Sequence, residues 1–312
     1  MSVPQPSVSL VVRALDEAEH IGTLLAAVAE QTRIPDEVVV VDSGSTDATV
    51  AIARSFGARI VAIAPEEFSF GRALNRGCAA ARGDILVFAS AHVVPVDDEW
   101  IRGLTAPFVD PEVSLVYGRQ TGDERSHFSE LEVMRRWFPE RSDPDQRHPF
   151  CNNANCAVRR SAWSRRPYDE SLTGLEDLEW AKRALAEGER IAYEAGAAIV
   201  HVHSEGFRAI VNRYEREAVA YRRITGHERL GLAEAGMLFV ASVSRDYLAA
   251  TVRRKLLRNL WAIPRFRAGQ YLGGYRGSAR AGEVSREVRR RFYYPKGFTA
   301  LERRRSSSGT PR

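Results

Sequence analysis

The chain has 312 residues, of which 44% are hydrophobic and 27% are charged. This composition excludes an intrinsically disordered chain, and the length allows one large α/β domain or one domain with an appendage. Three cysteines without regular spacing exclude a disulfide framework, and the net charge of +5 is compatible with an anionic partner.

The first part of the chain alternates between short apolar runs and segments with helical spacing. Strands are predicted at residues 8–12, 37–41, 59–64 and 85–89, and helices at 17–31, 46–56, 71–81 and 98–108. This alternation predicts βαβ units and a mostly parallel sheet with helices on its faces. Ligands of such sheets bind beyond the carboxyl ends of the strands, so the polar residues at those ends are candidate site residues.

The second part is less regular. The predicted elements are a strand at 114–117, a loop at 122–149 with a helix at 128–137, helices at 175–187 and 207–225, and strands at 191–193 and 198–202. Helices dominate from residue 233 onward. The predicted organisation is a nucleotide-binding and catalytic domain at 1–230, a basic helical extension at 231–300 and a disordered tail at 301–312.

Two common nucleotide-binding motifs are absent. The chain has neither a GxxxxGK[ST] loop nor a GxGxxG turn after the first predicted strand. A P-loop enzyme and a dinucleotide-dependent dehydrogenase are therefore disfavoured. The most informative stretch is VVVVDSGSTDAT at 38–49, in which a buried strand ends at Asp42 and a tight polar turn leads into a helix.

This stretch, together with VSLVVRALDEAEHIGTLL at 8–25, resembles family 2 of the inverting glycosyltransferases. The family commonly shows a strand that ends in an N-E or D-E pair, here Asp16 and Glu17, and then a VDxGSxDxT block. The resemblance continues through FSFGRALNRGCAAARGDILVFAS at 68–90 and GLEDLEW at 174–180, so it covers roughly residues 8–225. It implies a GT-A fold, which is Rossmann-like, and a nucleotide-diphosphate sugar as donor.

The resemblance also implies a set of donor-binding residues. These are Arg13, Leu15, Asp16, Glu17, Asp42, Ser43, Arg72, Asn75, Ser90 and Ala91. In the family pattern Asp42 contacts the base, and Arg72 and Asn75 approach the nucleotide and its diphosphate. Each has a plainer interpretation: Asp42 as a cap of the next helix, Arg72 as a surface charge and Asn75 as an ordinary helix polar residue.

The chain departs from the family where a DxD motif is expected to hold ribose and a divalent metal. Ser90, Ala91 and His92 stand there instead. We expect His92 to bind a divalent ion, Mn²⁺ or Mg²⁺, together with His203, which is favoured over His201 because it lies closer to the following loop. Metal-independent catalysis and a degenerate site remain open alternatives.

The acidic pair Glu176 and Asp177 matches the family's ED pair. By resemblance Asp177 is the base that takes the proton from the acceptor hydroxyl, and Glu176 contacts sugar or acceptor. Two acids in a first helical turn are also common capping chemistry. A helix N-terminus lowers the pKa of such acids, so burial or acceptor binding would have to tune Asp177.

The expected reaction is a single displacement at the anomeric carbon, in the synthesis of a polysaccharide or glycolipid. The acceptor is a saccharide or a lipid-linked saccharide, and the alternative function is an inactive module that binds nucleotide-sugar. Arg213, Arg216, Arg222 and Arg223 are candidates to reach the diphosphate, and Asn153 and Asn155 to approach the acceptor. An equally good interpretation of residues 151–160 is a strand edge and turn.

The basic C-terminal part favours an anionic membrane surface or a homodimer, and nucleic acid is not expected. No signal peptide or membrane-spanning run is evident, so the expected location is the cytoplasm, peripheral on the inner face of the membrane.

Overall fold

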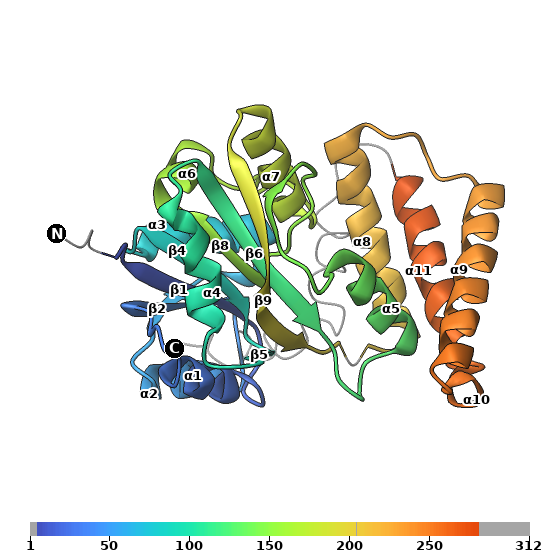
Figure 1. Ribbon diagram of the computed structural model, residues 1–312, viewed down its shortest axis with the longest axis horizontal. Helices are drawn as coiled ribbons and strands as arrows, with labels where there is room; N and C mark the ends of the chain where they lie inside the picture. The colour runs from blue at the N-terminus through green and yellow to red at the C-terminus, as the bar shows by residue number, and fades with distance from the viewer. Residues whose placement is uncertain (1–4, 204, 281–312) are drawn as a thin grey trace, which may run out of the picture.

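The computed structural model describes residues 5–203 and 205–280. It contains a mixed sheet of nine strands in the order β3-β2-β1-β4-β8-β6-β9-β5, with β7 paired to β9 (Figure 1). The strands are β1 (Val8–Ala14), β2 (Glu37–Asp42), β3 (Arg59–Ala62), β4 (Ile85–Ser90), β5 (Val93–Pro95), β6 (Val113–Thr121), β7 (Asp143–Gln146), β8 (Asn155–Arg159) and β9 (Arg190–His201). The predicted tail at 301–312, and residues 281–300 of the predicted extension, lie outside the described residues.

The half of the sheet that contains β1 to β4 is parallel, as predicted. β1 lies between β2 and β4, with Ala14 opposite Asp42 and Arg13 opposite Ser90. Nearly every side chain of β1 is buried, because helices cover both faces of the sheet. This register places the polar residues at the ends of β1, β2 and β4 along the same edge of the sheet.

The other half is mixed rather than parallel. β8 is antiparallel to both β4 and β6, and it lies in the stretch 151–160, for which a strand edge and turn was one of two interpretations. β9 runs parallel to β6 as one continuous strand, so the prediction of two strands at 191–193 and 198–202 is wrong. The register of β6 on β9 shifts between Gly118 and Gln120. Because of this irregularity, β9 continues through residues 194–197, where the sequence predicted a break between two strands.

Two helical layers enclose the sheet. One hydrophobic core lies between the sheet and α1 (Ile21–Ala29), α2 (Thr49–Ser55) and α4 (Trp100–Thr105), which a short 3₁₀ turn (Ala106–Val109) follows. The second lies under α3 (Phe70–Ala80), α6 (Arg160–Arg165) and α7 (Glu176–Ala186), and another 3₁₀ turn (Pro65–Glu67) precedes α3. The fold is therefore a three-layer α/β arrangement, as expected.

The remaining helices form a bundle beside the sheet. They are α5 (Phe128–Trp137), α8 (Phe207–Thr225), α9 (Leu232–Val252), α10 (Leu256–Asn259) and α11 (Ala262–Ser278). α11 packs against both α8 and α9, and α9 is the outermost helix (Figure 1). A buried ion pair joins Arg267 of α11 to Asp246 of α9, with Nε 2.7 Å from Oδ2. None of the helices in the described part of the chain is long and apolar enough to cross a membrane.

Candidate active site

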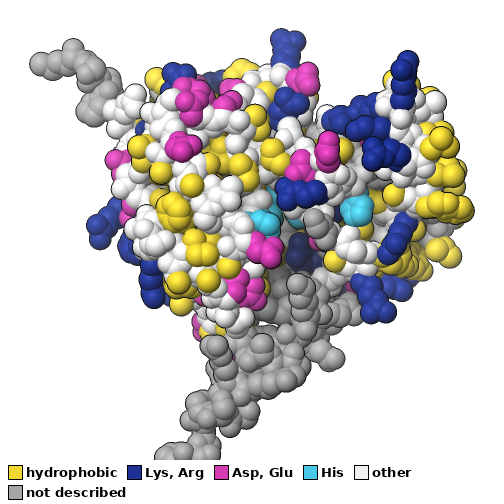
Figure 2. Space-filling model, turned by 90° about the horizontal axis from the view of Figure 1, so that it is seen from below, with side chains coloured by type: hydrophobic (Ala, Val, Ile, Leu, Met, Phe, Trp, Pro, Cys, Tyr) yellow, Lys and Arg dark blue, Asp and Glu magenta, His cyan; other side chains and the backbone are white. Residues whose placement is uncertain are grey.

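A cavity of about 540 Å³ opens between the sheet and the bundle. Arg13, Ser90, Gln120 and His201 reach it from the ends of β1, β4, β6 and β9, and the first turn of α7 forms a second wall. α5 and α8 supply acidic and basic side chains, and charged and histidine side chains border the hollow in Figure 2. The size suits a small organic ligand, and its polar groups converge from both parts of the chain.

The acidic pair begins α7. Leu175 precedes it with φ of +56°, a left-handed conformation that is uncommon for a residue with a branched side chain. Glu176 accepts hydrogen bonds from Arg13 Nη1 at 3.2 Å and Asn153 Nδ2 at 3.4 Å. Asp177 accepts from the backbone N–H of Leu178 at 2.8 Å and that of Asn153 at 3.1 Å. Both carboxylates are buried and line the cavity.

Burial and the neighbouring Glu176 raise the pKa of Asp177 to about 7, whereas the two backbone N–H groups and Arg13 act in the opposite direction. Burial therefore outweighs the helix N-terminus, which alone would lower this pKa. A carboxyl group that titrates near neutral pH can be ionised and still be a strong enough base to accept a proton.

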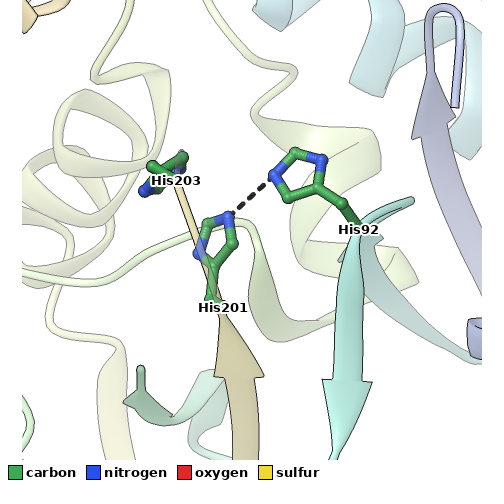
Figure 3. Close-up of side chains that lie close together, drawn as sticks. All are labelled: His92, His201 and His203. Atoms are coloured by element: carbon green, nitrogen blue, oxygen red, sulfur yellow. Dashed lines mark hydrogen bonds between the residues drawn. The ribbon is translucent and has the colours of Figure 1, made fainter. Parts of the chain in front are cut away.

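Three histidines meet at the opposite side of the cavity: His92 from the turn after β4, His201 at the end of β9, and His203 just beyond it (Figure 3). One nitrogen from each lies within 4.8 Å of the others, and His92 Nε2 is 3.0 Å from His201 Nε2. We call these residues the histidine cluster. The predicted pair His92 and His203 is brought together, and His201, which the prediction ranked lower, lies between them in the sequence and against both in space.

Each imidazole of the cluster is held through its Nδ1 atom. His92 Nδ1 lies 2.7 Å from Glu17, His201 Nδ1 lies 2.9 Å from Gln120 Oε1, and His203 Nδ1 lies 3.2 Å from Glu130. Because these oxygens accept hydrogen bonds, each Nδ1 donates, and the Nε2 atom of a neutral ring carries a lone pair.

The Nε2 atoms of His92 and His201 therefore present lone pairs to each other in their neutral forms, an arrangement that a shared cation would stabilise. Burial, reinforced by His203 and His92, lowers the pKa of His201 well below its usual value, so this ring is neutral at pH 7. Two nitrogen ligands at right angles and about 2.1 Å from one ion lie about 3.0 Å apart, as these two do. The donor set and its outer hydrogen bonds thus fit a divalent metal.

Arginines from β1 and α8 border the space between the two centres. The guanidinium groups of Arg13 and Arg216 lie 5.1 and 4.7 Å from the centre of the Phe70 ring. Arg213 pairs with Glu130 and Glu205, each at 2.8 Å. Of the four arginines predicted on this helix, Arg213 and Arg216 line the cavity, whereas the other two bond backbone carbonyls elsewhere: Arg222 that of Ser278 and Arg223 that of Ser171.

The predicted base-binding edge lies apart from the cavity lining. Asp42 accepts hydrogen bonds from the backbone N–H groups of Gly44 and Ser45, each at 3.2 Å, so it orders its own turn rather than capping α2. Asp16 accepts from Thr46 N–H at 2.7 Å and ties the two loops together. Ser43 is buried, with its hydroxyl on the carbonyl of Ala14.

Four more of the predicted donor-binding residues lie outside the cavity lining, and their roles in donor binding stay predictions. Asn75 uses its whole amide within the protein, because it bonds Tyr168, Glu170 and the indole N–H of Trp163. Arg72 pairs with Glu170 at 2.7 Å, and Ala91 is fully buried. Neither these three residues nor Leu15 line the cavity. Among the predicted donor-binding residues, Arg13 and Ser90 do.

Several cavity residues were not predicted. Gln120 and Glu130 lie in segments without a recognisable motif, and the pairing of β6 with β9 and the packing of α5 bring them to the site. Phe70 lies within the matched stretch at 68–90 and begins α3, but its ring was not singled out. Of the two asparagines proposed near the acceptor, Asn153 lines the cavity. Asn155 is buried and bonds the indole of Trp100 and two backbone carbonyls, which is a structural role.

Comparison with known proteins identifies the family of this chain. Residues 9–172 match the model of a family described as Glycosyl transferase family 2. The chain is 27% identical over 221 residues to the O-antigen chain rhamnosyltransferase RfbN of Salmonella typhimurium, covering 66% of this chain and 70% of the relative. It is 29% identical over 201 residues to WbaN of Salmonella anatum, which has the same description, covering 60% and 63%. A structure of the mannosyltransferase PcManGT from Pyrobaculum calidifontis, in complex with GDP-Man and Mn²⁺, superposes with a TM-score of 0.62 at 18% identity, covering 94% of this chain and 89% of the other.

Proposed function

Because this chain belongs to glycosyl transferase family 2, with a GT-A fold, and is therefore a glycosyltransferase, we propose that it moves a hexose or deoxyhexose from a nucleotide-diphosphate sugar to an acceptor hydroxyl with inversion. One observation carries the proposal. A buried carboxyl group with a pKa near 7, Asp177, faces the same cavity as three histidines that fit a divalent metal.

Asp177 is the proposed base. Its two backbone hydrogen bonds fix the carboxylate at the start of α7, and burial keeps its proton affinity high enough to accept the proton of an attacking hydroxyl. Glu176 is held next to the base by Arg13 and Asn153, and its proximity contributes to the raised pKa of Asp177. Inversion follows because the hydroxyl attacks from the face opposite the leaving diphosphate.

The histidine cluster is the proposed metal site, and a divalent ion bound there would supply positive charge for the diphosphate leaving group. Imidazole ligands favour transition metals such as Mn²⁺ over Mg²⁺, which prefers oxygen. Glu17, Gln120 and Glu130 orient the three rings through their Nδ1 atoms, so the ligands are arranged before any ion arrives.

Arg13 and Arg216 are proposed to hold the diphosphate. Both guanidinium groups border the cavity, and Phe70 keeps them side by side through cation–π contacts. The Nε atom of Arg216 is buried without a hydrogen-bond partner among the residues that the structure describes. A phosphate oxygen would satisfy it, because guanidinium donors match phosphate geometry.

The base and ribose are proposed to lie at the edge formed by the ends of β1 and β2, next to Ser90. Because the turn uses the carboxylate of Asp42, we assign Asp42 a positioning role: it fixes Ser43 to Ser45, against which the base packs. The acceptor is proposed to be a saccharide or a lipid-linked saccharide, as the names of the two Salmonella relatives suggest.

Asp177→Asn tests the proposal. We expect transfer to fall about a thousandfold, because the amide cannot accept the proton, while binding of nucleotide diphosphate measured by calorimetry stays within about twofold. Glu179→Gln is the matched control, because Glu179 lies in the same helical turn, pairs with Arg183 at 2.7 Å and does not line the cavity.

Retained transfer by Asp177→Asn would refute the assignment of the base. Wild-type protein that binds sugar nucleotides but neither transfers nor hydrolyses them would identify an inactive binding module instead. The anomeric configuration of the product, read by NMR, tests inversion separately.

A further inference from the structure

The α9 helix is apolar around most of its circumference, but only one side is covered. Ala235, Ser242 and Ala250 face the bundle. The opposite side carries Met237, Val240, Leu248 and Val252, all exposed. Hydrophobic side chains gather along the edge of the molecule formed by the bundle in Figure 2. A helix of this character is normally enclosed by protein or lipid, so the bare side calls for a partner.

The apolar surface continues into the turn after α9. Leu257 is 88% exposed and Trp261 is 83% exposed, the first in α10 and the second just before α11. Tryptophan with a neighbouring leucine at a protruding turn is typical of segments that sit at the boundary between lipid headgroups and acyl chains. We call the exposed side of α9 together with Leu257 and Trp261 the apolar ridge.

The charges around the apolar ridge have one sign. Between residues 237 and 261 the exposed charged side chains are Arg245, Arg253, Arg254, Lys255 and Arg258. The single acid in this stretch, Asp246, is buried and paired with Arg267. Arg253 pairs with Glu132 of α5 at 3.2 Å, which leaves the other four cations around the ridge. The surface therefore combines bare apolar side chains with net positive charge, which an anionic and partly apolar partner would complement.

We propose that the apolar ridge docks this protein on an anionic lipid bilayer. A second copy of the chain is a poorer occupant, because a two-fold contact through this side would bring like charges together. Residues 281–312 are themselves arginine-rich in sequence, which disfavours them as the cover for the same reason. Nucleic acid would match the charge but would leave Leu257 and Trp261 without an apolar partner.

The docking places the helices on the membrane rather than through it. The ridge would bury side chains at the depth of the headgroups, with Arg245, Lys255 and Arg258 reaching lipid phosphates. The inference rests on the surface alone and does not depend on the proposed reaction. If both hold, the bound enzyme would work next to acceptors that are carried by lipid.

The experiment is cosedimentation of the full-length chain with phosphatidylcholine vesicles, with and without phosphatidylglycerol. We expect binding to the anionic vesicles that weakens as salt rises. The double variant Leu257→Ser with Trp261→Ser, and separately the triple variant Arg245→Gln, Lys255→Gln and Arg258→Gln, should each lower the partition coefficient about tenfold or more. Quenching of tryptophan fluorescence by brominated lipid should be strong in wild type and largely lost in Trp261→Phe.

Val109→Ser is the matched control, because Val109 is 91% exposed in the 3₁₀ turn beside the sheet, and it should bind vesicles like wild type. Because all the substituted side chains are exposed, circular dichroism should show that every variant folds. Absence of wild-type binding, or binding that neither set of substitutions weakens, would overturn the proposal. A dimer in solution that the double variant dissociates would assign the ridge to a second copy instead.

Discussion

The edge formed by β1 and β2 and the wall formed by α7, β9 and α5 differ in whether their carboxylates line the cavity. At the β1–β2 edge, Asp16 and Asp42 accept hydrogen bonds from backbone N–H groups of neighbouring turns and hold the loops in place. At the wall, Asp177 and Glu130 are buried and line the cavity. The stretch with the clearest sequence motif thus shapes the site, whereas side chains outside that motif supply the groups suited to chemistry.

The largest effect is expected from His201→Ala, on the wall side of the site. Removing the most buried ring of the histidine cluster should lower Mn²⁺ affinity at least about 100-fold, because even outer-sphere partners of metal ligands account for 10- to 100-fold. Calorimetry on the metal-free protein measures this, and Mg²⁺ should bind wild type more weakly than Mn²⁺. His148→Ala, at an exposed histidine outside the cavity, is the control. Unchanged Mn²⁺ binding by His201→Ala would remove the metal from the cluster.

The second prediction concerns pH. Because Asp177 must be ionised to act as a base and burial raises its pKa to about 7, kcat/KM should fall about tenfold per pH unit below neutrality. A pH–rate profile between pH 5 and 9, flat across neutrality, would contradict the assignment.

The same shift has a consequence for stability. The pKa of Asp177 is higher in the folded than in the unfolded chain, so the native state binds this proton more tightly. The stability that the group contributes is fully present below its ordinary pKa of 3.8 and is lost as pH rises through about 7. Denaturant unfolding should therefore show Asp177→Asn gaining free energy of unfolding relative to wild type between pH 5 and pH 8.

The smallest effect is expected at the β1–β2 edge. Asp42→Asn replaces one of the acceptor oxygens that order the turn, so the free energy of unfolding should fall by about 1 kcal/mol. Nucleotide affinity per folded molecule should change less than about fivefold, since Asp42 acts through the turn. A loss of nucleotide affinity far beyond that, with stability unchanged, would show that the carboxylate itself binds the base.

The sequence predicted the parallel half of the sheet well because continuous apolar runs such as those of β1 and β4 mark strands that are buried on both faces. For β8 it left two interpretations open, because the first residue of this strand is a buried asparagine that bonds Trp100 rather than an apolar residue. β9 was divided in two because Glu194 and Gly196 break its apolar pattern, although the extra residues form a bulge within β9 and the strand continues past them.

The same limit applies to the site. Asp177 and His92 were found because they stand where a family motif has, or should have, a functional residue. Gln120 and Glu130 were not found, because each orients a histidine that belongs to a distant part of the chain, and no local sequence pattern marks such a residue. The place of Asn75 in the motif gave no sign that Trp163 and Tyr168 use its amide.

A side chain at Gly118, in β6, would disturb the site although this residue carries none of its functional groups. A side-chain carbon there would lie 2.1 Å from the carbonyl oxygen of Ala197 and 2.4 Å from the amide nitrogen of Asn155. β9 would have to move away from β6, and it carries His201 four residues further on. A single added methyl group would thus displace His201 from the histidine cluster without touching any of the three rings, so loss of function in a variant at this position would be mistaken for a simple folding defect.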